Sequence, residues 1–140
     1  MGALTHAATR DVFAAQANAL AESGVDMLWI ETMSSTEEIA AALEAAEATG
    51  LTVAATMTFD TAARSMMGVL PQDFRVFGAA NKADFLGVNC GIGPAELLHS
   101  VSGMAQVHND TPLIAKGNCG IPSYVDGAIH YHGTPALMAN

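Results

Sequence analysis

The stretch from Asp26 to Met33 reads DMLWIETM, and its apolar centre ends at a carboxylate. Met27 to Ile30 consists of four large apolar residues, and it follows Gly24, a residue type that commonly ends a helix. We therefore predict that Met27 to Ile30 forms a buried strand with Glu31 at its end. The fold depends on whether this strand is one member of a repeating series.

Helical patterns flank this strand on both sides. Before it, residues 5–23 carry apolar side chains at helical spacing. That apolar stripe consists of Val12, Phe13, Ala17 and Leu20. After the strand, the sequence Ser35-Thr36-Glu37-Glu38 matches a capping box, which predicts a helix that runs to about Thr49.

The same alternation continues along the chain. We predict further strands over 52–57, 85–89 and 113–116, with helices between them and a long loop from Thr58 to Val69. The strands recur about every 25 to 33 residues, the length of one strand–helix unit. Such units build either a doubly wound sheet or an eightfold (β/α) barrel, and the pattern alone does not choose between them. The residues after Gly117 lack periodicity, so we predict a loop there, and we treat 1–140 as one domain or part of one.

Composition narrows the class of protein. The chain is 51% hydrophobic and 14% charged, which is typical of strands buried on both faces. Its formal net charge is −9 and it has no basic run, so nucleic acid and anionic membranes are not expected partners. Met1 to Ala8 does not resemble a signal peptide, and we expect a cytoplasmic protein with Cys90 and Cys119 as free thiols.

Unusual polar residues follow each predicted strand. They are Glu31 after the first strand, Thr58 and Asp60 after the second, Asn89 and Cys90 at the third, and Lys116 and Asn118 at the fourth. In both candidate folds the carboxyl ends of parallel strands form the active face. The sequence therefore predicts one pocket to which four strand ends contribute.

Each of these residues also has a structural interpretation. Glu31 could be a solvated or helix-capping carboxylate, or it could bind a cationic group such as an ammonium. Cys90 could be a small buried hydrophobe, or a thiolate that acts as a nucleophile or metal ligand. His130 and His132 form a His-x-His pair that could bind metal or simply lie on the surface. Gly91 to Pro94 could cradle a phosphate, although the glycine pattern is incomplete.

Four strings together resemble the homocysteine S-methyltransferase family. They are DMLWIETM (26–33), VAATM (53–57), GVNC (87–90) and NCGIP (118–122). The resemblance covers essentially the whole chain and implies an eight-stranded (β/α) barrel with zinc held by three cysteine thiolates. It implies that Cys90 is the first zinc ligand, that Glu31 binds the amino group of homocysteine, and that the backbone around Asn89 shapes the same pocket.

The sequence also departs from the family pattern. The Gly-Gly-Cys-Cys motif that would supply the other two zinc ligands does not occur in these 140 residues. Cys119 stands where alanine is expected, and either it, His130 or His132 could lend a replacement ligand. Thr32 stands where betaine-dependent members carry an aromatic residue, so a corrinoid- or sulfonium-linked methyl donor is at least as consistent as betaine.

These observations lead to one expectation and two alternatives. We expect a partial barrel of about four β/α units that, within a complete barrel, transfers a methyl group to the thiol of homocysteine and forms methionine. A truncated or degenerate fragment without zinc is the first alternative, and a barrel enzyme that binds phosphate at Gly91 to Pro94 is the second. Because half a barrel leaves open sheet edges, we also expect the chain to associate with itself or with the rest of its barrel.

Overall fold

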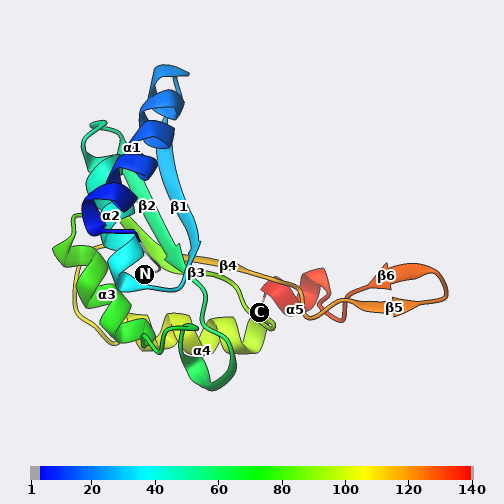
Figure 1. Ribbon diagram of the computed structural model, residues 1–140. Helices are drawn as coiled ribbons and strands as arrows, with labels where there is room; N and C mark the ends of the chain where they lie inside the picture. Colours follow the sequence, from blue (N-terminus) through cyan, green and yellow to red (C-terminus); the bar gives the residue numbers. More distant parts are fainter. Residues whose placement is uncertain (1–3, 140) are drawn as a thin grey trace.

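In the computed structural model, which describes residues 4–139, four parallel strands form one sheet in the order β1-β2-β3-β4 (Figure 1). The strands are β1 (Met27–Met33), β2 (Thr52–Met57), β3 (Phe85–Cys90) and β4 (Leu113–Gly117). The helices that alternate with them are α1 (His6–Glu22), α2 (Thr36–Glu47), α3 (Pro71–Ala80) and α4 (Pro94–Ala105). A short 3₁₀ turn, η1 (Thr61–Ala63), lies in the loop after β2. The predicted series of strand–helix units is confirmed, and the arrangement is that of a partial (β/α) barrel.

Local sequence explains where the helices begin. The Ser35 hydroxyl accepts a hydrogen bond from the Glu38 N–H at 3.4 Å, as the capping pattern predicts. Thr5 caps α1 in the same way through the Ala8 N–H at 3.2 Å. Both α3 and α4 have proline in their first turn, where the missing N–H costs nothing.

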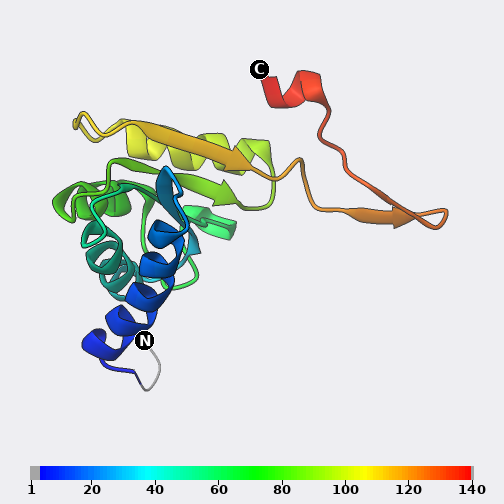
Figure 2. The ribbon, with the colours of Figure 1, turned by 90° about the horizontal axis from the view of Figure 1, so that it is seen from above.

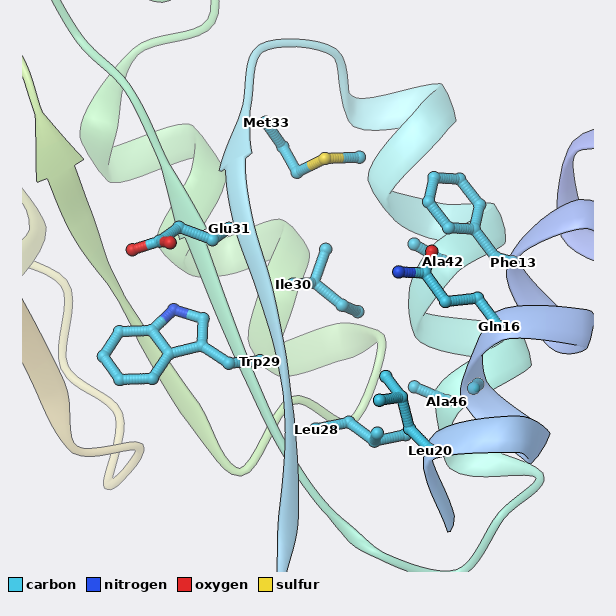
Figure 3. Close-up of a pocket in the computed structure, with 11 residues that line it drawn as sticks. Phe13, Gln16, Leu20, Leu28, Trp29, Ile30, Glu31, Met33, Ala42 and Ala46 are labelled. Carbon is cyan, nitrogen blue, oxygen red and sulfur yellow. The ribbon is translucent and has the colours of Figure 1, made fainter. Parts of the chain in front are cut away.

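The hydrophobic core lies between one face of the sheet and the helices. Successive strand residues point to opposite faces, and one set is buried against the helices. This set includes Leu28, Val53, Ala55, Met57, Leu86 and Val88, which pack with Ile39, Ala42, Leu43, Phe74 and Met104 from the helices. In Figure 3, Leu28, Ile30 and Met33 point from β1 toward α1 and α2, whereas Trp29 and Glu31 point to the other side.

Two glycines let neighbouring elements approach closely. A Cβ added at Gly78 of α3 would lie 2.3 Å from a methyl carbon of Leu86, so glycine allows this helix to pack onto β3. A Cβ added at Gly87 would lie 2.1 Å from the carbonyl oxygen of Ile114 on the neighbouring strand. Gly87 therefore has no room for a side chain beside the backbone of β4, whereas a side chain at Gly78 would force Leu86 to move.

The two sheet edges and the second sheet face are open. Neither β1 nor β4 has a second neighbouring strand within residues 4–139. Trp29 on the uncovered face is 43% exposed. A pocket of about 310 Å³ lies beside β1, between the edge strand and α1, with apolar residues such as Phe13, Leu20 and Ile30 in its lining (Figure 3). These features are those of a barrel segment whose next strands would cover this surface.

Several sequence-based expectations are wrong in detail. The segment after Gly117 is not all loop, because it contains the antiparallel hairpin β5 (Ser123–Val125) and β6 (Ala128–His130) and the short helix α5 (Pro135–Ala139). The hairpin turn contains Asp126 and Gly127, both with positive φ, which is the dipeptide that two-residue hairpin turns prefer. Figures 1 and 2 show the hairpin extending away from the sheet.

The inward helical stripes also need correction. Val12, part of the apolar stripe predicted for residues 5–23, is 63% exposed. Helical periodicity therefore also marks apolar positions that the described residues do not bury. No helix within residues 4–139 is long and apolar enough to span a membrane.

Candidate functional site

The four strand ends meet, as the position of their polar residues predicts. The Thr32 N–H of β1 donates to the side-chain oxygen of Asn89 on β3 at 3.1 Å. The Thr58 hydroxyl, just after β2, donates to the Asn89 carbonyl at 3.2 Å. The Asn118 N–H, just after β4, donates to the Cys90 carbonyl at 3.3 Å. The strand carrying Asn89 and Cys90 therefore lies at the centre of the site.

A bulge in β1 turns Thr32 toward this centre. The pairing of β1 with β2 is regular from Met27 to Ile30 and resumes at Met33 with a shift of register. Within the shift, Thr32 has φ 63°, an uncommon conformation for a β-branched residue. The bulge frees the Thr32 N–H from the strand ladder, and the side chain of Asn89 accepts it instead.

Cys90 has a matching strained backbone at the end of β3. Its φ is 59°, and the following Gly91 has φ 75°. The Cys90 sulfur accepts a hydrogen bond from Asn89 Nδ2 at 3.1 Å and lies 4.0 Å from the Thr32 hydroxyl. Strained non-glycine residues persist only where their surroundings hold them, and they concentrate at functional sites.

The Asn89 side chain joins the two strained residues. Besides its bonds to the Thr32 N–H and the Cys90 sulfur, it donates to the Thr32 hydroxyl at 2.7 Å. It is only 1% exposed, so it is held in a fixed orientation. The sequence suggested a role for the backbone around this residue, but the side chain is the organising element. No pattern in the sequence indicates that contact, because it depends on the bulge.

Glu31 forms an ion pair across the open face of the sheet. Its carboxylate lies 2.5 Å from the Lys116 ammonium of β4. That ammonium also lies 5.4 Å from the centre of the Trp29 ring, and the Trp29 indole N–H donates to the Thr56 hydroxyl at 3.2 Å. The side chains of Glu31 and Lys116 are 38% and 59% exposed. The sequence places Lys116 at a strand end, but it does not indicate the pairing of Lys116 with Glu31.

Other candidate residues lie apart from this centre. Cys119 is partly buried in the segment after β4, where its carbonyl accepts the Gly133 N–H at 2.7 Å. His130 lies on β6 in the extended hairpin, and His132 follows it, both exposed. Among residues 4–139, no group of three or more His, Cys, Asp or Glu side chains could hold a metal ion. The described residues therefore do not form a complete ligand set for a metal ion.

Comparison with known proteins gives a family and a fold. The family model described as homocysteine S-methyltransferase matches residues 1–140. Among solved structures, the chain is similar to the type I 3-dehydroquinate dehydratase of Clostridium difficile, with a TM-score of 0.51 and 16% sequence identity. That match covers 77% of this chain and 44% of the dehydratase, so the chain spans less than half of that structure. At this identity the likeness concerns the fold alone.

Proposed function

Because the chain belongs to the homocysteine S-methyltransferase family, we propose that its four β/α units form part of a barrel that methylates the thiol of homocysteine to give methionine. The observation that carries the proposal is the position of the Cys90 sulfur. It lies at the carboxyl end of the central strand, bonded to Asn89 and close to Thr32. This is the face on which barrel enzymes bind their substrates.

Cys90 would be one ligand of the zinc ion that the family uses. When bound, zinc acts as a Lewis acid that favours the thiolate form of a coordinated thiol at neutral pH. Asn89 Nδ2 donates to the Cys90 sulfur at 3.1 Å, which holds the sulfur in a fixed position at the strand end. Since the described residues supply no complete ligand set, the remaining ligands would come from the rest of the barrel.

Glu31 would bind the ammonium group of homocysteine. Its carboxylate already holds an ammonium, that of Lys116, at 2.5 Å, which supports the capacity of this position to bind a cationic group. In the transfer step the sulfur of homocysteine, having released its proton to solvent water, attacks the methyl carbon of the donor. The bond between that carbon and the donor breaks, and the donor keeps the electron pair.

The donor would be a sulfonium or a corrinoid-linked methyl group. A quaternary ammonium such as betaine is favoured by a cage of aromatic rings. Thr32 supplies no ring beside Glu31, and the nearby Trp29 ring lies beneath the Lys116 ammonium. These contacts favour donors that need no aromatic cage.

The experiment that tests the proposal measures methionine formed from homocysteine by a barrel that contains this chain. Three donors would be compared: a sulfonium, methylcobalamin and betaine. We expect turnover with the sulfonium or methylcobalamin, and a KM for homocysteine raised at least about tenfold by Glu31→Gln. Turnover with none of the donors, with zinc supplied, would refute the proposal and support the alternative of a non-catalytic segment.

A further inference from the structure

The Glu31–Lys116 pair spans the open face of the sheet. The two residues belong to β1 and β4, the first and last strands of the sheet. Neighbouring strands lie ~4.8 Å apart, so three strand spacings would separate them by roughly 14 Å in a flat sheet. Their side chains meet at 2.5 Å because they reach toward each other over β2 and β3.

The pair is poorly placed to be a stabilising element. Its side chains are 59% and 38% exposed, and ion pairs with this much solvent contact contribute little to folding. The position of the pair indicates its role better than its contribution to stability does. Lys116 is the register partner of Asn89, the residue that holds the Cys90 sulfur. The Lys116 cation, with its Glu31 partner, therefore lies on the strand directly beside the residue that bonds to the thiol.

We propose that Lys116 binds the α-carboxylate of the amino acid substrate while Glu31 binds its α-ammonium. Lys116 is then a specificity-determining residue that selects a zwitterionic amino acid over a simple aminothiol. The identity of that amino acid as homocysteine rests on the proposed function. The charge pairing itself requires only an α-amino acid.

Charge balance supports an exchange of partners. When a zwitterion enters between the two side chains, Lys116 transfers from the Glu31 carboxylate to the substrate carboxylate, and Glu31 transfers to the substrate ammonium. Each charge keeps a partner throughout, which matters once a complete barrel removes the site from water. In the absence of substrate, the Trp29 ring and Glu31 hold the Lys116 ammonium in place.

Binding can be followed with a single reporter. Trp29 is the only tryptophan in the chain, and its indole N–H signal in an ¹H–¹⁵N NMR spectrum reports on the ring next to Lys116. Three ligands are titrated into the protein: homocysteine, 3-aminopropane-1-thiol, which lacks the carboxylate, and 2-aminobutyrate, which lacks the thiol. The proteins are the wild type, Lys116→Met and Lys116→Arg.

We expect wild type to bind homocysteine at least about tenfold more tightly than 3-aminopropane-1-thiol. We expect Lys116→Met to bind the two about equally, because only the carboxylate contact is lost, and Lys116→Arg to retain the preference. Retained binding of the aminothiol by Lys116→Met shows that the variant is folded. Equal affinity of wild type for the two ligands, or an unchanged preference in Lys116→Met, would overturn the inference.

The remaining outcomes separate this inference from the proposed function. If 2-aminobutyrate binds as tightly as homocysteine and with the same dependence on Lys116, the carboxylate site is supported without any contribution from the thiol. If homocysteine binds without dependence on Lys116, or if none of the three ligands binds, the inference is overturned. The proposed function is decided separately, by methionine formation in a complete barrel supplied with zinc.

Discussion

Substitution of Asn89 by alanine tests the network that holds the site together. The side chain is buried and makes two hydrogen bonds to Thr32 and one to the Cys90 sulfur. At about 1 kcal/mol for each bond, and less for the one to sulfur, Asn89→Ala should lower the free energy of unfolding by about 2–3 kcal/mol. With a urea m-value of about 2 kcal/mol/M, the midpoint would fall by about 1–1.5 M.

The matched control is Asn118→Ala, at the same end of the sheet. Asn118 is exposed, and its side chain donates one hydrogen bond, to the Gly91 carbonyl at 3.1 Å. Its loss should cost no more than about 1 kcal/mol. The two variants would be compared by urea unfolding under identical conditions. An Asn89→Ala cost equal to or below that of Asn118→Ala would refute the claim that Asn89 organises the site.

A double-mutant cycle with Thr32→Gly locates the effect. Glycine should relieve the strain of the positive φ at this position, which stabilises the fold by ~1–2 kcal/mol. It also loses the hydroxyl bond to Asn89 and raises the chain entropy of the unfolded state, and both of these effects destabilise the fold. The single variant should therefore be nearly neutral. Because glycine keeps the N–H that bonds to Asn89, the two substitutions should couple by about 1 kcal/mol, the value of the hydroxyl bond alone. Strict additivity would show that the Asn89–Thr32 hydroxyl contact contributes nothing.

Three further predictions concern packing, pH and assembly. Gly78→Ala places a carbon 2.3 Å from Leu86, and this overpacking should lower the free energy of unfolding in urea by about 1–3 kcal/mol. The control is Gly103→Ala, also in a helix, where the added carbon meets nothing closer than 3.7 Å. That substitution should leave the free energy of unfolding unchanged or raise it by up to about 1 kcal/mol. The Ser35 hydroxyl also donates to the Glu37 carboxylate at 2.7 Å and lowers the pKa of Glu37 from its ordinary value of 4.5. This contact therefore stabilises the fold above about pH 4.5, and its contribution is lost as the pH falls through the folded pKa. Wild type should lose more stability than Glu37→Gln between about pH 6 and pH 3, and parallel pH profiles would contradict this. Because both sheet edges are open, light scattering should show association of the 140-residue chain, and a stable monomer at high concentration would count against it.

The regular part of the fold was predictable because its signals are local. The strand over 52–57 has the predicted bounds, and the helix after Ser35 begins at its capping residue. The buried strand around Trp29 was predicted to end at Ile30 but continues to Met33. The extension contains the bulge at Thr32, which depends on a contact with Asn89, 57 residues away in sequence. Local periodicity carries no information about such a contact.

The site was predictable in position but not in arrangement. Parallel strands place their carboxyl ends together, so the meeting of the strand ends at Asn89 and Cys90 follows from the order of elements alone. The Glu31–Lys116 pair depends on how far the sheet curls, which the sequence pattern does not report. The hairpin at Asp126 and Gly127 was missed although its turn dipeptide is a local signal, because the few residues on either side are exposed and lack apolar alternation.

The central claim is that Cys90 is the point at which this chain takes part in the thiol chemistry of its family. The most direct test is the zinc content, by elemental analysis, of a purified barrel that contains this chain, as wild type, Cys90→Ala and Cys119→Ala. Our account predicts about one zinc per barrel in wild type and in Cys119→Ala, and none in Cys90→Ala. Zinc retained in Cys90→Ala would contradict this account. Zinc lost in Cys119→Ala alone would show that the metal binds at Cys119 and not at the strand end that carries Cys90.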